Sequence, residues 1–547
     1  MKMYRSHILV AEDSKSLSKG AKEIEELISK ELRTLGLEEE VLVAPTGSLG
    51  FEDVGVAIAV YPEGVIYAPV TQNDVPRIIR EHLLKGRIVK EIAHEIGKKD
   101  VTVTESRAER VLSIQERVLL RRVGVINPES IEEYIAEDGY LALENAIEKG
   151  PQWVLEEVKA SELRGRGGAG FPTGKKWEFT AKAKSNVKYV ICNADEGEPG
   201  TFKDRVIMEG DPHLLIEGMI LAGFATGANN GYIYIRGEYD LSIKRLKKAI
   251  DQAYAYGFLG ENILGSGFSF DIEIKKGAGA YICGEETALM ESIEGKRGEP
   301  RKKPPYPPTC GLWGKPTVIN NVETLANIPP ILVNGADWFK KFGVPGAYGT
   351  KLFSLMGDVN YKGVIEIPFG VKLSSVINDV GFGIKSGKKL KGVILGGVSG
   401  SLITPGEIDT PVDFNSLALI EAGPGSGSIV VLSEDRCIVD IAKNIAYFFR
   451  HESCGKCTPC RVGTEEMYKI IDNISKGFGE VKDLERLEKL STSMRLTSFC
   501  PLGQTAPNII QQSLRKFRDE WLEHINERKC SSNVCKFEEI TEEVINE

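Results

Sequence analysis

Long hydrophobic runs are missing from this chain of 547 residues. No run reaches the roughly eighteen apolar residues that a membrane-spanning helix needs. The start of the chain is followed only by the short apolar segment Ile8–Ala11, so no secretory signal is expected. An excess of positive charge is also absent, because the 78 Asp and Glu outnumber the 69 Lys and Arg and give a net charge of -9. This balance argues against nucleic acid as the main partner, and we expect a cytoplasmic protein without a membrane span.

Cysteine is present in a pattern that disulfides do not explain. Cys454, Cys457 and Cys460 are evenly spaced in Ser-Cys-Gly-Lys-Cys-Thr-Pro-Cys-Arg, and Cys500 follows in Ser-Phe-Cys-Pro-Leu-Gly. Three thiolates in one loop and a fourth from afar are typical of a cubane [4Fe–4S] cluster. The alternatives are buried free thiols or zinc, which usually takes paired ligands rather than an even trio.

A second set of metal-ligand residue types lies near the C-terminus. His524, Cys530 and Cys535 supply three zinc ligands in one interpretation, with Cys437 or a partner's residue as the fourth. The alternative is two exposed thiols on a polar tail. Three further cysteines are expected in the core or near a bound cofactor, without a redox role. They are Cys192, Cys283 and Cys310.

A glycine-rich basic segment runs from Arg164 to Trp177, as Arg-Gly-Arg-Gly-Gly-Ala-Gly-Phe-Pro-Thr-Gly-Lys-Lys-Trp. Glycines bring backbone N–H groups close to a ligand, and the basic side chains supply positive charge, so the segment favours an anion cradle. It differs from both the dinucleotide fingerprint and the P-loop. The alternative is a flexible basic loop.

Three polar segments follow in chain order. Cys192-Asn-Ala-Asp-Glu-Gly-Glu-Pro-Gly200 comes directly after a predicted strand, where open α/β sheets bind ligands. Glu285 and Glu286 are predicted to open a helix, whose N-terminus favours negative charge. Asn320 and Asn321 begin another transition from loop to helix. A solvated acidic turn is the alternative for the first of the three segments.

Taken together, these segments resemble the NADH-binding flavoprotein subunit of respiratory complex I. They are similar as well to the diaphorase-type subunits of soluble electron-bifurcating hydrogenases and of NAD(P)H:ferredoxin complexes. The resemblance runs in the same order from about residue 140 to residue 525. It implies hydride transfer between NAD(H) and FMN, followed by single-electron transfer through one [4Fe–4S] cluster.

The resemblance also implies roles for individual residues. The residues expected to bind FMN are Gly165, Arg166, Gly167, Lys176, Asn193, Asp195, Glu196, Gly284, Asn320 and Asn321. The residues expected to bind NADH are Phe171, Phe179, Glu198, Glu285, Glu286, Lys303 and Tyr306. The cluster is expected on Cys454, Cys457, Cys460 and Cys500.

The expected fold class is a multidomain α/β protein. Its predicted parts are a thioredoxin-like domain (1–97), a helical connector (98–140), a complex-I-type FMN- and NADH-binding α/β domain (141–345), a β-grasp (SLBB) module (346–425), a helical [4Fe–4S] domain (426–525) and a tail (526–547).

Two departures from the related subunits are predicted. Ala11, Ser16, Ser48 and Glu52 stand where the thioredoxin-like domain would carry the four ligands of a [2Fe–2S] cluster, and none is a thiol. We therefore expect a structural docking domain there. The sequence also shows no cysteine run for an additional C-terminal ferredoxin module.

A single cubane cannot be the last electron carrier, so the resemblance implies partners. These are a thioredoxin-like [2Fe–2S] subunit and a larger multi-cluster iron–sulfur subunit, with ferredoxin as an indirect co-substrate if the complex bifurcates electrons. Two alternatives stay open at this point. One is a non-catalytic assembly subunit with a degenerate flavin site, and the other is a diaphorase that prefers NADP(H).

Overall fold

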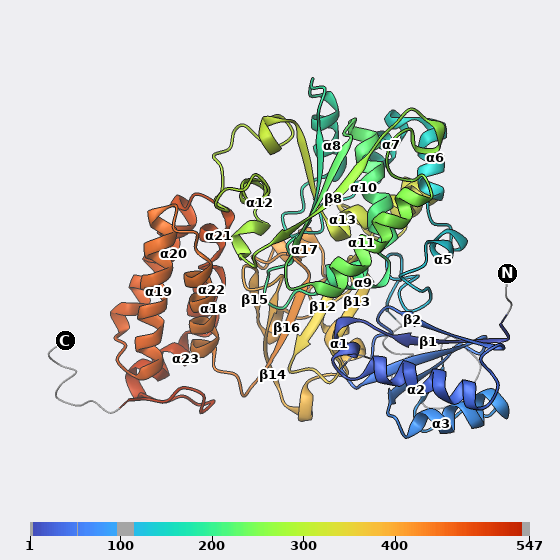
Figure 1. The fold of residues 1–547 in the computed structure, drawn as a ribbon. Helices are drawn as coiled ribbons and strands as arrows, with labels where there is room; N and C mark the ends of the chain where they lie inside the picture. Colours follow the sequence, from blue (N-terminus) through green and yellow to red (C-terminus); the bar gives the residue numbers. More distant parts are fainter. Residues whose placement is uncertain (1–3, 52, 96–113, 539–547) are drawn as a thin grey trace.

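The computed structural model describes residues 4–51, 53–95 and 114–538 (Figure 1). The N-terminal unit is a five-stranded sheet in the order β2-β1-β3-β4-β5, in which β1 and β2 are parallel. Helix α2 covers it with Ile24, Ile28 and Leu32, which recur at helical spacing and are buried. The elements are β1 (Ser6–Ala11), α1 (Ser14–Leu17), α2 (Ala21–Thr34), β2 (Val41–Thr46), β3 (Val56–Tyr61), β4 (Val65–Val70), α3 (Asp74–Ile78), η1 (Ile79–Leu84) and β5 (Ala93–Glu95).

The positions expected for [2Fe–2S] ligands have local structural partners instead. Ala11 is buried at the end of β1. The Ser16 hydroxyl donates to Asp13 Oδ2 at 2.5 Å, and the Ser48 hydroxyl accepts the Gly50 N–H at 3.1 Å. Glu52 lies outside the described residues.

The predicted helical connector is wrong for residues 114–130, which contain no helix. The backbone N–H groups of Leu119 and Leu120 donate to the Glu366 carboxylate at 3.0 Å, so a side chain from a distant strand takes the bonds that a helix would make. Residues 98–113 of the connector lie outside the described part. Three helices follow this segment, α5 (Ile131–Ala136), α6 (Leu141–Lys149) and α7 (Pro151–Ala160).

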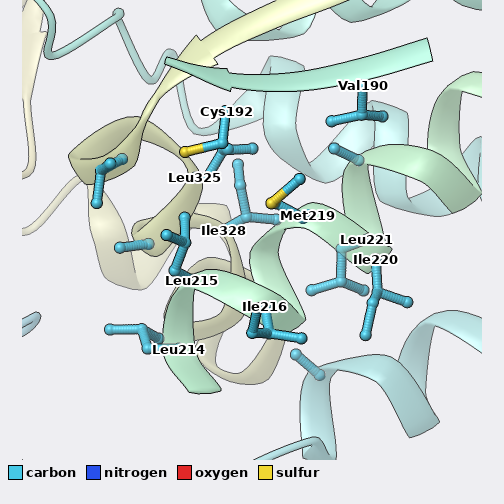
Figure 2. Packing of buried hydrophobic residues seen from close by; sticks show 14 of the residues in the cluster. Val190, Cys192, Leu214, Leu215, Ile216, Met219, Ile220, Leu221, Leu325 and Ile328 are labelled. Carbon is cyan, nitrogen blue, oxygen red and sulfur yellow. The ribbon is translucent and has the colours of Figure 1, made fainter. Parts of the chain in front are cut away.

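The largest core surrounds a parallel four-stranded sheet in the order β8-β7-β6-β9. Helix α10 is buried along nearly its whole length and packs beneath it, with Leu215 and Met219 directed toward Cys192 of β6 (Figure 2). The strands are β6 (Tyr189–Ala194), β7 (Asn230–Arg236), β8 (Asp271–Gly277) and β9 (Thr317–Asn321). The helices are α8 (Thr173–Lys182), α9 (Lys203–Gly210), α10 (Pro212–Thr226), α11 (Asp240–Ala255), η2 (Ile263–Gly265), η3 (Tyr281–Gly284), α12 (Glu286–Ile293), η4 (Leu312–Gly314), α13 (Val322–Ala326), α14 (Ile328–Asn334) and α15 (Ala336–Phe339).

A second five-stranded sheet lies in the middle of the molecule, in the order β13-β12-β16-β14-β15 (Figure 1). Its central strand β16 (Ser428–Ser433) is parallel to β12. The module therefore extends to Ser433, beyond the predicted end at residue 425, because removing β16 would divide the sheet. The other elements are β10 (Gly343–Val344), β11 (Ala347–Tyr348), β12 (Thr350–Gly357), β13 (Gly363–Pro368), α16 (Leu373–Ser375), η5 (Val376–Val380), η6 (Lys385–Gly387), β14 (Leu390–Leu395), β15 (Ser401–Ile403), η7 (Pro405–Glu407) and α17 (Phe414–Ala418).

The C-terminal part is a helical bundle on the side of the molecule opposite the N-terminal unit (Figure 1). Helices α18 and α19 pack along each other, and α20 and α22 complete the core with Leu484, Leu487 and Ile510. The elements are α18 (Ile438–Glu452), α19 (Thr458–Lys476), α20 (Val481–Thr497), α21 (Pro501–Thr505), α22 (Asn508–Lys516), α23 (Arg518–Leu522) and η8 (Glu523–Glu527). None of the described helices is both long enough and apolar enough to span a membrane.

Candidate functional site

The parallel sheet has a topological switch point between β6 and β9. The chain runs from β6 outward through β7 to β8 and then returns to form β9 on the other side of β6. Asn193 and Asn321 pair in register at the carboxyl ends of these two strands. Ligands of open α/β sheets bind in the crevice at such a point. The predicted residues Asn193, Asn320 and Asn321 are thereby brought together.

Asp195 follows β6 in this crevice and is the clearest sign of a ligand-binding site. Both oxygens of its carboxylate are buried and have no hydrogen-bond partner among the described residues. Burial raises the pKa of Asp195 to about 7. Beside it, Asn193 donates to the Gly284 carbonyl at 2.9 Å and accepts the Asp195 N–H at 3.1 Å. A buried acceptor without a donor fits a ligand that carries N–H or O–H groups, as the flavin ring and ribityl chain do.

The glycine-rich loop lies beside the same crevice. It is closed at its base by Gly165, whose N–H donates to the Phe171 carbonyl at 2.9 Å. A Cβ atom at Gly167 would lie 3.0 Å from the Asn321 Cβ, and one at Gly170 would lie 2.7 Å from the Phe414 ring. The loop therefore depends on glycine for its close packing, and its backbone is free of side chains where a ligand approaches.

Arg166 is placed differently from the other residues expected to bind FMN. Its guanidinium is buried and donates to the carbonyls of Tyr348 at 2.8 Å and Arg164 at 3.2 Å, and burial lowers its pKa to about 10. Its N–H donates to the Thr324 hydroxyl at 2.8 Å. The side chain is thus largely engaged inside the protein, and only its buried Nε has no hydrogen-bond partner among the described residues. The Arg166 carbonyl accepts from Lys351 Nζ at 3.2 Å.

A group of alternating charges lies at the start of α12. Lys303 Nζ lies 2.7 Å from a Glu285 oxygen and 2.8 Å from a Glu286 oxygen, and Lys176 lies 3.3 Å from Glu286. Although burial opposes it, the two lysines lower the pKa of Glu286. Glu285 also caps α12 by accepting the N–H groups of Thr287 and Ala288. Four of the predicted residues therefore form one ionised cluster.

Three predicted aromatic residues are unusually exposed for their size. Phe171, Phe179 and Tyr306 are 46%, 54% and 57% exposed. Such rings are available to stack on a flat heterocycle. Their exposure also shows that none of the three rings is a core residue.

The acidic residues Glu196 and Glu198 are held in two different environments. Glu196 accepts the Asp204 N–H at 2.8 Å and the Tyr239 hydroxyl at 3.1 Å, and burial together with Asp204 raises its pKa to about 7. Glu198 accepts the Tyr281 hydroxyl at 2.6 Å and the Ser399 N–H at 2.8 Å.

Sequence reasoning missed Asp204, Tyr281 and Ser399 as members of the site. Tyr281 lies among the glycines and glutamates of a predicted ligand-binding segment, so an aromatic residue next to them was a usable signal. Ser399 comes from the central sheet module, about two hundred residues from Glu198, and no local pattern marks it.

The four cysteines expected to hold the cubane line one small cavity together with Ile282, Pro300 and Phe499. Burial raises the pKa of Cys460 to about 11, and the charges of the three other thiols add to the rise. Four thiolates this close together would repel one another and are stable only around a cationic centre. Gly455, with φ of +79°, turns the loop between the first two. The donor set and its arrangement fit an iron–sulfur cluster.

A second cysteine group lies at the base of the helical bundle. The ligand atoms of Cys437, His524, Cys530 and Cys535 all lie within 4.8 Å of one another. Cys437 Sγ is 3.3 Å from His524 Nε2 and 3.7 Å from Cys535 Sγ. The structure therefore brings the three predicted residues together with Cys437 rather than leaving them on a separate tail.

The three remaining cysteines differ in burial. All ten cysteines are free thiols within the described part of the chain. Cys192 and Cys283 are buried, as expected, whereas Cys310 is exposed. Cys310 therefore does not lie in the core, and a position near the flavin stays a prediction.

Comparison with known proteins identifies the family. A model of the Nuo51 FMN-binding domain matches residues 158–330, and a model of the NADH-ubiquinone oxidoreductase-F iron-sulfur binding region matches residues 440–524. NADP-reducing hydrogenase subunit HndC of Solidesulfovibrio fructosivorans is 52% identical over 421 residues, 77% of this chain and 86% of that protein. This chain belongs to the family of complex-I-type NADH-binding flavoproteins.

Further relatives of this flavoprotein agree. The NADH-quinone oxidoreductase F protein of Aquifex aeolicus is 49% identical over 404 residues, covering 74% of this chain and 93% of that protein. Among solved structures, an NAD+-reducing [NiFe]-hydrogenase in the H2-reduced state matches with a TM-score of 0.67 and 33% identity. That match covers 95% of this chain and 84% of the hydrogenase chain.

Proposed function

We propose that this chain is the flavoprotein subunit of a multi-subunit NAD(P)H oxidoreductase. It catalyses hydride transfer between NAD(H) and FMN, and electrons then pass singly through one [4Fe–4S] cluster. The observation that carries this proposal is the short turn η3. At one end of it the Gly284 carbonyl is hydrogen-bonded to Asn193 in the crevice, and within it Ile282 lines the cavity of the four cysteines. A single turn thus separates the two sites, which suits electron transfer between them.

FMN, when bound, supplies the conversion between two-electron hydride transfer and one-electron transfer. The chain's own residues bind and orient the reactants. Asp195 and Asn193 present acceptors and an amide at the strand ends, and the glycine-rich loop presents backbone N–H groups. Lys176 keeps a positive charge at the edge of the crevice. No side-chain acid or base is required for the hydride step.

The dinucleotide pocket is proposed on the other side of the Glu285–Glu286 pair. Phe171, Phe179 and Tyr306 offer rings for stacking, and Lys303 sits between the two glutamates. Carboxylates held in fixed positions accept hydrogen bonds from ribose hydroxyls. The preference for NAD(H) over NADP(H) is tested by steady-state rates with both donors.

The domain assignments are part of this proposal. A β2-β1-β3-β4 order with parallel β1 and β2 supports a thioredoxin-like interpretation of residues 1–97. The mixed sheet around β12 and β16 supports the β-grasp (SLBB) interpretation of the module that begins at residue 346. The helical bundle that carries the cysteines supports a separate [4Fe–4S] domain.

Partners follow from the chemistry of a single one-electron centre. We propose that electrons continue to a thioredoxin-like [2Fe–2S] subunit and a larger multi-cluster iron–sulfur subunit in the cytoplasm. Ferredoxin enters as an indirect co-substrate where the assembled complex bifurcates electrons. Purification of the intact complex, with its subunits identified and its iron counted, tests this assignment.

The decisive test of the function separates an enzyme from a non-catalytic assembly subunit. Purified protein is expected to absorb near 450 nm, to contain one FMN and to reduce a dye with NADH. A flavin-free preparation from a fully assembled complex, in which NADH reduces no dye, would favour the assembly subunit and overturn the proposal.

A zinc ion is proposed at Cys437, His524, Cys530 and Cys535. Tetrahedral zinc with Zn–S bonds of about 2.3 Å places its sulfurs roughly 3.8 Å apart, close to the 3.7 Å between Cys437 and Cys535. His524 Nδ1 lies 2.7 Å from the Glu520 carbonyl, which only accepts. Nδ1 is therefore the donor, and Nε2 is left to bind a metal. The ion would join the end of the central sheet module to the tail.

The expected result of metal analysis is one zinc per chain in addition to the iron of the cluster. Cys535→Ser is expected to lose the zinc and keep the iron, whereas Cys310→Ser, at an exposed cysteine outside both groups, keeps both. Equal zinc in Cys535→Ser and wild type would contradict the site.

A further inference from the structure

The loop between β14 and β15, Gly396–Gly400, reaches from the central sheet module into the nucleotide site. There it meets the Glu198 carboxylate. The Ser399 N–H donates to Glu198 Oε1 at 2.8 Å, and the Ser399 hydroxyl donates to the same oxygen at 3.1 Å. One residue of a different domain therefore supplies two hydrogen bonds to a carboxylate that the proposed function assigns to NAD(H).

The two oxygens of Glu198 are unequally occupied. Oε1 accepts both bonds from Ser399, and Oε2 accepts one bond from the Tyr281 hydroxyl at 2.6 Å. Because each carboxylate oxygen has two lone pairs, Ser399 saturates Oε1, and the Val398 backbone adds a further hydrogen bond to the carboxylate. Ser399 thus leaves a single oxygen of Glu198 available to a hydroxyl or amide of the nucleotide.

The Gly396–Gly400 loop packs against Glu198 so closely that the backbone at Gly397 has no room for a side chain. Gly397 has φ of +92°, and a Cβ atom there would lie 2.3 Å from Glu198 Cγ. Any side chain at this position would displace the glutamate.

Ser399 and Tyr281, the two residues that donate hydrogen bonds to Glu198, are themselves hydrogen-bonded to the helices of the C-terminal bundle. Asn508 of α22 donates to the Ser399 carbonyl at 3.2 Å, and Glu452 of α18 accepts the Tyr281 N–H at 2.9 Å. Both groups that hold Glu198 are therefore fixed by the domain that carries the cysteines. This makes their positions independent of the nucleotide and suits a preorganised acceptor.

We propose that Ser399 is a positioning residue for NAD(H), which acts by fixing the Glu198 carboxylate as a single, oriented acceptor. The inference rests on the proposed function, which assigns Glu198 to the dinucleotide. Ser399 itself is placed behind the carboxylate, so its effect reaches the nucleotide through Glu198.

The charge state of Glu198 gives the proposal a distinctive readout. Burial raises the pKa of Glu198, and the hydrogen bonds from Tyr281 and Ser399 counteract that rise. Two charged groups lie against the segments that flank Glu198. Glu452 accepts the Tyr281 N–H, and a Cβ atom at Gly197 would lie 2.8 Å from a guanidinium nitrogen of Arg236. Removing the Ser399 hydroxyl raises the pKa further, so the ionised acceptor is lost at a higher pH than in wild type.

The main test measures binding of NAD+ to FMN-loaded protein by calorimetry and compares three variants. Ser399→Ala is expected to weaken binding roughly three- to tenfold, the range for the loss of one ordinary hydrogen bond, because Ser399 acts on the nucleotide only through Glu198. Ser399→Thr keeps a hydroxyl and is expected to restore binding. Ser401→Ala is the matched control, because the Ser401 hydroxyl donates to the Glu421 carbonyl, away from Glu198.

Kinetics supply the second readout. In Ser399→Ala, KM for NADH is expected to rise while kcat at saturating NADH stays near wild type. The acid limb of 1/KM against pH is expected to move to higher pH. If Ser399→Ala matches Ser401→Ala in NAD+ affinity and in its pH profile, the role of Ser399 is overturned.

A glycine pair provides an independent check. In Gly397→Ala the added methyl group would displace the Glu198 side chain. Gly387→Ala is the control, because it imposes a similar left-handed backbone strain (φ of +66°) at a position where a Cβ atom meets nothing within 4 Å. A loss of NAD+ binding in Gly397→Ala alone supports the positioning role, and equal binding in the two variants contradicts it. Wild-type protein that holds FMN but binds no NAD+ would overturn the proposed function itself.

Discussion

At the scale of single residues, the site is marked by polar groups that the protein leaves without partners. Neither oxygen of Asp195 finds a donor in the described part of the chain, although the side chain is buried. Folding with such a group is costly unless a ligand satisfies it. The same residue follows a buried strand in the sequence, so its importance was predictable, but its isolation was not.

Asp195 gives a prediction about pH and FMN-free protein. Its pKa is raised to about 7 in the folded state, above the unfolded value of 3.8. Its contribution to stability is therefore present below about pH 4 and is lost as the pH rises to about 7. FMN-free Asp195→Asn is expected to lose less stability than wild type between pH 5 and pH 7.5, measured by thermal unfolding.

The control for this pH effect is Asp251→Asn, at an exposed position on α11. It is expected to follow the wild-type pH dependence. Asp195→Asn is also expected to bind FMN about tenfold or more weakly, because an acceptor is replaced in part by a donor. Parallel pH profiles for all three proteins would contradict the assignment.

At the scale of elements, the ends of helices and strands place the chemistry. Helix α12 begins beside the crevice, and its N-cap, Glu285, both closes the helix and contacts Lys303. One carboxylate therefore serves local structure and the proposed nucleotide site. A sequence pattern of two glutamates before a helix predicts the cap, but it does not reveal the contact with a lysine of the following loop.

The two roles of Glu285 are separable by substitution. Glu285→Ala is expected to lose the cap, at a cost of about 1 kcal/mol in unfolding free energy, and to raise KM for NADH. Glu285→Ser keeps a capping oxygen but is too short to reach Lys303, so it is expected to retain stability and still raise KM. Ser130→Ala removes the cap of α5, outside the site, and serves as the control for cap loss. A normal KM in both Glu285 variants would contradict its role.

At the scale of the whole molecule, buried ion pairs join the flavin domain to the central sheet module. Glu323 of α13 is fully buried and lies 2.7 Å from Lys203 and 3.4 Å from Lys351 of β12. It also accepts the Leu352 N–H at 2.8 Å. Because the partners come from two domains, this network sets how the module that carries Ser399 is placed against the crevice.

Glu323→Gln is expected to leave the buried Lys351 without its counter-charge, whereas Lys203 keeps Asp204 at 2.6 Å. Breaking one partner of a buried pair costs about 3–5 kcal/mol, so a clear fall in the midpoint of urea unfolding is expected. Glu178→Gln removes a surface carboxylate paired with Lys159 and Lys182 and is expected to change stability by less than about 1 kcal/mol. Equal midpoints for the two variants would show that the network does not join the domains.

The residue types of the candidate sites could be predicted from the sequence alone. The spacing of Cys454, Cys457 and Cys460, the glycines of the cradle and the polar residues after β6 depend on short-range geometry, which neighbouring residues control. Two predictions were wrong, the helical connector at residues 114–130 and the end of the sheet module at residue 425. In both places, residues distant in the sequence supply the hydrogen bonds of the local backbone. The Glu366 carboxylate accepts the backbone N–H groups of Leu119 and Leu120 in the connector, and β16 lies between β12 and β14 in the central sheet.

Only the tertiary structure decided which distant segments meet. Cys437 joins His524 across more than eighty residues, and Ser399 reaches Glu198 from another domain. The reason is physical, because such contacts depend on how sheets and helices pack against one another. The periodicity and spacing within a segment do not encode that packing. Asn193 and Asn321, for example, lie side by side only because the sheet has the strand order β8-β7-β6-β9.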